Sequence, residues 1–254
     1  MSDHPQPGRN FAVKAAIFEG GLALVALVVG ALLGVDPMRT LHSDWTAIAW
    51  GAAAAVPPLM LLAAAIYVSL SPVRRLTDLV EHLLVPPLRQ STLAELAIIS
   101  LLAGLGEEML FRGAIQAALA DRIEPPYGPW LALAVASLLF GLAHFITFTY
   151  AVFATLMGAY LGLIWMESGN LLVPIVAHAV YDFTALVYLV KLRPVPTRAA
   201  PRDETANHDS LQDAIGSNRS GDDESPSLRA DDRPPDEQPR ETASEQRADH
   251  DDST

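Results

Sequence analysis

The sequence predicts an all-α fold, in which a polytopic bundle of transmembrane helices precedes a disordered C-terminal tail. Several apolar runs reach the ~20 residues that a helix needs to cross a hydrocarbon core of ~30 Å. The alternation of polar and apolar residues that is typical of half-buried strands is absent from these runs. From residue 193 onward, 16 acidic and eight basic residues are mixed with Pro, Ser and Gly, so we expect this segment to be disordered.

Six membrane spans are expected, over residues 11–34, 45–70, 93–120, 129–148, 149–166 and 171–192. The first run is long for a signal peptide and has no clean small-residue cleavage pattern, so we expect it to be retained as a signal anchor. In the fifth run, Gly158 and Gly162 form a small-xxx-small pair, which favours close packing against another helix.

Residues 71–92 have a different pattern, because apolar side chains recur at helical spacing and charged side chains occupy the other face. The apolar set is Leu76, Leu79, Val80 and Leu83, and the charged set is Arg74, Arg75, Asp78 and Glu81. This pattern predicts an interfacial helix that lies on the bilayer surface and ends at Pro86 and Pro87.

The distribution of charge indicates the orientation of the chain. Six spans put both termini on one side of the membrane, and the basic residues of that side are Arg9, Lys14, Arg74, Arg75, Arg89, Lys191 and Arg193. The opposite loops hold only Arg39 and Arg122, so the bias predicts cytoplasmic termini. The tail carries −8 of the net charge of −12, so the acidic balance describes the tail and requires no acidic-binding partner.

Six ionisable side chains fall within stretches that are otherwise apolar: Glu107, Glu108, Arg112, His144, His178 and Asp182. A charge at the centre of a membrane helix costs roughly 2.5–3.5 kcal/mol on insertion scales, so such groups usually face a protein interior and have a function. The chain has no cysteine, which excludes disulfides, cysteine nucleophiles and cysteine-based metal sites. Any metal would need histidine and carboxylate ligands.

The third expected span contains the first motif, EExxxR. Glu108 and Arg112 are four residues apart and share one helix face, so they can neutralise each other. Glu107 points about 100° away around the helix and is left free of that pair. It is therefore the candidate general base, although a purely structural ion network would give the same motif.

Two histidine motifs follow on later spans. Phe140 and His144 form FxxxH, and His178 and Asp182 form HxxxD, each with the spacing that places both residues on one helix face. Asp182 can accept a hydrogen bond from one nitrogen of His178 and so fix its tautomer. Three helices that each bring polar groups into the membrane favour an active site over packing alone.

Hydrolysis by an activated water is the chemistry that this set supports, since no serine or cysteine has the setting of a nucleophile. Glu107 and His144 would hold and deprotonate the water, and His178, oriented by Asp182, would stabilise the oxyanion. As an alternative, Glu107, His144 and His178 would bind Zn²⁺ with a water in the open position. The spacing does not decide between the two, because the usual HExxH helix is missing.

The motifs EExxxR, FxxxH and HxxxD, in this order on successive spans, resemble the CPBP family of intramembrane proteases. This family includes the type II CAAX prenyl proteases and bacteriocin-processing and self-immunity proteins. The resemblance covers about residues 93–191, including the stretch 168–174 before His178. It implies a conical cavity open to the membrane and endoproteolysis near the end of a membrane-associated substrate.

By position, the resemblance implies that Glu107 and His144 activate water, that His178 and residue 182 form the oxyanion side, and that Glu108 and Arg112 support the site. The prenyl proteases carry Asn where this chain has Asp182, and an ionised carboxylate cannot donate as an amide does. Three regions are expected: an N-terminal two-span region with the interfacial helix (1–92), a CAAX-protease-like membrane domain (93–192) and the tail (193–254). Both metalloprotease and metal-free, glutamate-dependent mechanisms are argued for the family.

The expected partners are membrane lipids and a membrane-embedded or lipid-anchored protein or peptide substrate, and no nucleic acid. The Ala- and Arg-rich composition is typical of a bacterial protein, so we expect a multi-pass protein of the bacterial inner membrane. Peptide maturation, immunity and membrane-protein turnover all stay open as processes. The competing functions are a proton-coupled transporter, for which the chain shows no internal repeat, and a non-catalytic membrane scaffold or immunity protein.

Overall fold

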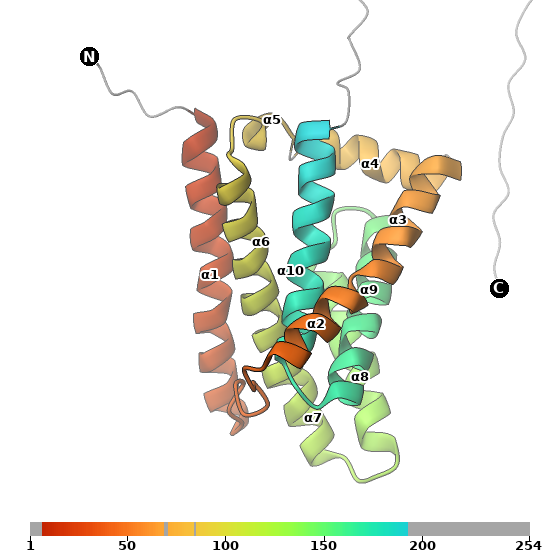
Figure 1. Cartoon of the computed structure of the whole chain (residues 1–254). Coiled ribbons are helices and arrows are strands. Elements are labelled where there is room, and N and C mark those ends of the chain that lie inside the picture. Colours follow the sequence, from red (N-terminus) through yellow and green to blue (C-terminus); the bar gives the residue numbers. More distant parts are fainter. Residues whose placement is uncertain (1–6, 69–70, 84, 193–254) are drawn as a thin grey trace, which may run out of the picture. The chain divides into compact units, whose positions relative to one another are not determined.

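A computed structural model describes residues 7–68, 71–83 and 85–192, and within these ranges the chain forms helices and no strand (Figure 1). The all-α class is therefore confirmed. The expected disordered tail, residues 193–254, lies outside the described residues. The elements are α1 (Pro7–Leu33), α2 (Trp45–Ala54), α3 (Val56–Val68), α4 (Ser71–Leu83), α5 (Val85–Leu88), α6 (Leu93–Glu108), η1 (Met109–Gln116), α7 (Ala117–Arg122), α8 (Tyr127–Ala143), α9 (Phe148–Ser168), α10 (Leu172–Val187) and η2 (Tyr188–Leu192).

Four helical stretches of the described chain are long and apolar enough to cross a membrane: Phe11–Leu33, Trp45–Val68, Phe148–Ser168 and Leu172–Leu192. Helix α8 is apolar but shorter, and the stretch from α6 to α7 is continuous but carries the charged motif. The chain is a membrane protein with transmembrane helices, and the count of six spans stays a prediction. Many large apolar side chains face outward, among them Leu32, Trp45 and Tyr67, as a lipid environment allows.

Two expected elements differ from the structure in detail. The run over residues 45–70 forms two helices with a break at Ala55, because Pro57 and Pro58 follow and a proline ring cannot continue the hydrogen-bond ladder of a preceding helix. The helix expected over 71–92 is confirmed as helix in α4, but its expected end at Pro86 and Pro87 is wrong, because both prolines lie within the short helix α5. Proline is tolerated in the first turn of a helix, where its missing N–H group would have no intrahelical partner. The side chains of Leu76 and Val80 are not among those described, so its position on the membrane surface stays a prediction.

Local sequence sets the ends of the helices that carry the polar motifs. Thr92 and Glu95 form a capping box at the start of α6, and Thr147 caps α9 by accepting a hydrogen bond from the Tyr150 backbone N–H at 3.2 Å. Gly169 ends α9 with φ of 62°, a left-handed conformation that glycine adopts without steric penalty.

Close packing brings the polar helices together (Figure 1). Helix α6 packs between α1 and α10, and α8 packs against α9. At Gly106, a Cβ atom would lie 2.5 Å from the Glu19 carbonyl oxygen, and at Gly158 it would lie 3.2 Å from the Phe140 Cβ. Gly106 therefore needs to be glycine for the backbones to approach as closely as they do, and the tight contact at Gly158 confirms its expected role in packing.

Candidate active site

The first half of the site is a buried network of charged groups around the end of α6. Glu108 is the last residue of α6, and η1, a π-helical stretch, begins at the next residue. The Arg112 guanidinium donates to Glu108 Oε1 at 2.8 Å and to the Gly158 carbonyl at 2.7 Å, and it lies 4.8 Å from the centre of the Phe140 ring. Glu108 and Arg112 are 0% and 1% exposed, so the predicted neutralising pair is confirmed and is fully buried.

His178 on α10 is held by the same network. Its Nδ1 atom lies 2.8 Å from Glu108 Oε1. Since Glu108 is paired with Arg112 and accepts, Nδ1 carries the proton and donates, which leaves a lone pair on Nε2 of the neutral ring. Glu108 therefore supplies the tautomer-fixing contact that the sequence assigned to Asp182, whose Oδ2 lies 3.5 Å from Nε2, at the long limit of hydrogen-bond geometry.

This difference arises from the packing of helices against one another and not from spacing along the sequence. The spacing of four residues does bring Asp182 to the face of His178, as predicted, but α6 packs against α10 and brings Glu108 closer to the other ring nitrogen. Asp182 is left more exposed than its neighbours, with a side chain 33% exposed.

His144 follows the last residue of α8 and its ring is fixed by Phe140 in two ways. The rings stack with their centres 4.6 Å apart, and His144 Nδ1 lies 2.9 Å from the Phe140 carbonyl oxygen. A carbonyl only accepts, so Nδ1 donates and Nε2 presents its lone pair, as in His178. The predicted common face of Phe140 and His144 is confirmed.

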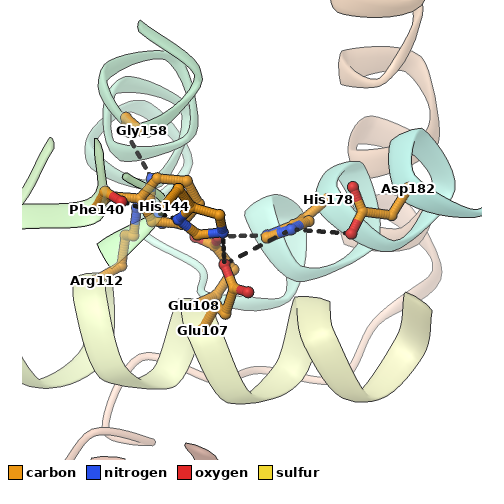
Figure 2. Close-up of polar contacts among 8 residues, drawn as sticks. All are labelled: Glu107, Glu108, Arg112, Phe140, His144, Gly158, His178 and Asp182. Carbon is orange, nitrogen blue, oxygen red and sulfur yellow. Dashed lines mark hydrogen bonds and ion pairs between the residues drawn. The ribbon is translucent and has the colours of Figure 1, made fainter. Parts of the chain in front are cut away.

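Glu107 faces both of these nitrogens (Figure 2). Its Oε2 atom lies 3.7 Å from His144 Nε2 and 4.0 Å from His178 Nε2, and no described residue offers it a hydrogen bond. In the neutral tautomers all three atoms are acceptors, so a donor is needed between them. A water molecule has the size and the two protons for this place.

The site opens into a cavity of about 410 Å³, a volume typical of small-ligand sites. Its polar groups are gathered at Glu107, His144, His178 and Asp182, and its other walls are mostly apolar. Those walls come chiefly from α3 and α9, and they include Pro57, Pro58, Leu61, Leu62, Ala65, Phe153, Leu156, Met157 and Leu161.

The candidate metal ligands are the Glu107 carboxylate and the Nε2 atoms of His144 and His178. Within residues 7–68, 71–83 and 85–192, no group of three or more His, Asp or Glu side chains is arranged to hold a metal ion. The Glu107 oxygen lies 3.7 and 4.0 Å from the two Nε2 atoms, whereas two donors of a tetrahedral Zn²⁺ site with bonds of about 2 Å lie roughly 3.3 Å apart. The three donors are thus more widely spaced than in a formed zinc site, and the binding of Zn²⁺ stays a prediction.

Three ionisable or polar residues near the site were missed at the level of sequence. Glu19 on α1 has a buried Oε2 atom without a hydrogen-bond partner among the described residues, and its carboxylate interacts electrostatically with Glu107 and Asp182. Tyr150 and Tyr181 line the cavity. The signal for Glu19 was available, because it is a carboxylate within an apolar run, whereas the tyrosines belong to no polar motif.

The fold and the site together define a membrane protein with a buried carboxylate–imidazole cluster at the end of a largely apolar cavity. The model of one protein family, described as type II CAAX prenyl endopeptidase Rce1-like, matches residues 89–184. The chain thus has an Rce1-like domain, and its predicted relationship to the CPBP family of proteases is confirmed. Searches of curated proteins and of solved structures each found no match.

The matched segment contains every residue of the three motifs, and helices α1 to α5 precede it. Glu19, whose carboxylate interacts electrostatically with Glu107 and Asp182, lies on α1, in a part of the chain that the family match does not cover.

Proposed function

We propose that this protein is an intramembrane endopeptidase, which hydrolyses a peptide bond of a membrane-associated protein or peptide with a water that Glu107 and His144 activate. The observation that carries the proposal is the buried Glu107 Oε2 atom, which has no described hydrogen-bond partner and faces His144 Nε2 at 3.7 Å. A carboxylate within one water of a second acceptor has the geometry of a general base.

In the proposed reaction, Glu107 takes one proton from the water as the water oxygen attacks the carbonyl carbon of the peptide. The carbonyl oxygen becomes an oxyanion, and the C–N bond then breaks as the amine leaving group takes up the proton that Glu107 accepted from the water. His178, held by Glu108, and Asp182 are assigned to the oxyanion side of the site. Glu108 and Arg112 keep His178 in place and have no direct role in proton transfer.

The apolar walls of the cavity support a substrate that brings a lipid chain or an apolar peptide segment to the site. We place the protein in the bacterial inner membrane, with both termini in the cytoplasm, on the charge bias of its loops. No step of the proposed mechanism passes through a metal ion.

The test is quantitative mass spectrometry of new protein termini in membranes of cells that express either the wild-type chain or Glu107→Gln at equal levels. Glutamine keeps the size of the side chain and removes the base, so termini that depend on Glu107 are expected to form about 10²–10⁴ times more slowly in the variant. Glu124→Gln, in an exposed loop position, is the matched control and is expected to behave as wild type.

Identical termini from wild type and Glu107→Gln, with both proteins expressed and inserted, would contradict the proposal and favour a transporter or a scaffold. A second arm repeats the wild-type experiment with a zinc chelator. Loss of the Glu107-dependent termini on chelation, with recovery on addition of Zn²⁺, would replace the metal-free mechanism by a zinc mechanism at the same residues.

A further inference from the structure

The cavity contains many hydrogen-bond acceptors and few donors. Among its lining residues, Glu107 and Asp182 accept only when they are ionised, and the neutral rings of His144 and His178 have already committed their N–H groups. A tetrahedral oxyanion needs donors aimed at the place where its charge develops. In the described part of the chain, that leaves the three tyrosine hydroxyls of the cavity.

A doubly protonated His178 does not change this balance. Its Nε2–H group would face Asp182 Oδ2 at 3.5 Å and Glu107 Oε2 at 4.0 Å, so two carboxylates compete for the added proton. The oxyanion would then still need a donor that no carboxylate of the site claims.

One of the three hydroxyls is already engaged. Tyr160 donates to the Ala54 carbonyl oxygen at 2.7 Å, which ties α9 to the end of α2. No hydrogen bond to a described residue is found for the hydroxyls of Tyr150 and Tyr181, which both interact electrostatically with Asp182.

Tyr150 is the better placed of the remaining two. Its hydroxyl also interacts with Glu107, whereas that of Tyr181 interacts with Asp182 and with Tyr150. The Tyr150 ring lies edge-on to the His144 ring, with the centres 6.1 Å apart. Its backbone is fixed by the Thr147 cap at the first turn of α9, so the ring is carried by a rigid element.

We propose that Tyr150 is a catalytic residue, which donates a hydrogen bond to the oxyanion that forms when water attacks the substrate carbonyl. The inference rests on the proposed function and adds to it the donor that Asp182, as an ionised carboxylate, does not supply. As the water oxygen bonds to the carbonyl carbon, the C=O electron pair moves to the oxygen and Glu107 takes the water proton. The Tyr150 O–H group stays intact and its hydrogen bond shortens; when the C–N bond breaks, the pair returns to the carbonyl.

The test uses the full chain in membranes and follows the rate at which Glu107-dependent termini appear on endogenous membrane proteins. Tyr150→Phe keeps the ring and removes the donor, and it is expected to lower this rate by about 10²–10³-fold, the loss that is typical when one oxyanion donor is removed. Tyr127→Phe is the control, since its side chain is 76% exposed and does not line the cavity. It is expected to keep the rate within about threefold of wild type.

A second variant separates a chemical role from a structural one. In Tyr150→Phe/Asp182→Asn the new amide N–H group is a donor at the position next to His178, so we expect the rate to rise at least tenfold above that of Tyr150→Phe. A wild-type rate in Tyr150→Phe, or no recovery in the inserted double variant, would overturn the assignment. Equal termini in wild type and Glu107→Gln would instead overturn the proposed function itself, so the two failures are distinguishable.

Discussion

Glu107 and Glu108 are neighbours in the chain, yet their carboxylates lie in opposite settings. Glu108 is fully buried and accepts from both Arg112 and His178 at 2.8 Å. Glu107 is 7% exposed, borders the cavity, and its Oε2 atom has no hydrogen-bond partner among the described residues. A rotation of about 100° around one helix separates a paired structural charge from an unpaired one.

The difference shows what each carboxylate can do. Glu108 Oε1 accepts two hydrogen bonds and so fixes the ring of His178, although Glu108 Oε2 has no hydrogen-bond partner among the described residues. A buried acceptor without a partner costs free energy of folding, about 1–3 kcal/mol for a typical group, and stays available to bind or deprotonate a ligand. We therefore expect substitutions on the Glu108 side to act on stability first, and substitutions on the Glu107 side to act on turnover first.

The largest effect on stability is expected for Arg112→Met. This change leaves the Glu108 carboxylate buried without its cation, and breaking a buried ion pair in this way costs roughly 3–5 kcal/mol. The measurement is the free energy of unfolding in detergent micelles, with Glu107→Gln as the comparison, since it removes no ion pair between buried partners. Equal stability of Arg112→Met and wild type would show that the two sides of the site do not differ as described.

The double variant Glu108→Leu/Arg112→Met separates the effect of this ion pair on stability from its effect on turnover. Replacing both charges by apolar side chains is often neutral for stability, so the free energy of unfolding should recover most of the loss. Turnover should not recover, because the hydrogen bond that orients His178 is gone. Recovery of both properties would contradict the positioning role of Glu108.

The paired side of the site was the more predictable from sequence. Glu108 and Arg112 are four residues apart on one helix, and the spacing alone predicts their contact, which the structure confirms at 2.8 Å. The same applies to Phe140 and His144. Apolar runs predicted the helices for a similar reason, since a single periodicity along the chain determines them.

Contacts between helices were not predictable in this way. The bond from His178 to Glu108 joins residues 70 positions apart, so local spacing favoured Asp182 instead. The π-helical stretch η1 was missed because the same residues also suit an α-helix, and the break at Ala55 was hidden by an apolar run. The electrostatic interaction of Glu19 with Glu107 likewise depends on a contact between helices, the close approach of α1 and α6 at Gly106.

Glu19 is a third carboxylate, for which we expect an effect on stability smaller than that of Arg112→Met. Its buried oxygen has no described partner, and it interacts with the like charges of Glu107 and Asp182. Glu19→Gln removes this repulsion at constant size, so we expect the free energy of unfolding to rise by about 1 kcal/mol. The same detergent titration measures it, with the exposed Glu124→Gln as control, and a loss of stability would assign a partner to Glu19 that the described residues do not include.

The smallest effect on the free energy of unfolding is expected for an ion pair that lies outside the apolar spans. Arg39 donates to both Asp121 oxygens, at 2.5 and 3.0 Å, and links the segment between α1 and α2 to α7. The side chains are 39% and 45% exposed, so solvent screens the pair. We expect Arg39→Ala to lower the free energy of unfolding by less than about 1 kcal/mol at neutral pH, although Arg39 bonds to both carboxylate oxygens, against roughly 3–5 kcal/mol for the buried pair of Arg112.

The pH dependence of this small effect has a defined sign. The hydrogen bond from Arg39 lowers the pKa of Asp121 below its ordinary value of 3.8. A group whose pKa is lower in the folded protein than in the unfolded chain contributes stability that is present above pH 3.8 and is lost as the pH falls through the folded pKa. Unfolding of wild type and Arg39→Ala should therefore converge between about pH 4 and pH 2, and a difference that grows on acidification would mean that Asp121 is not the partner through which Arg39 acts.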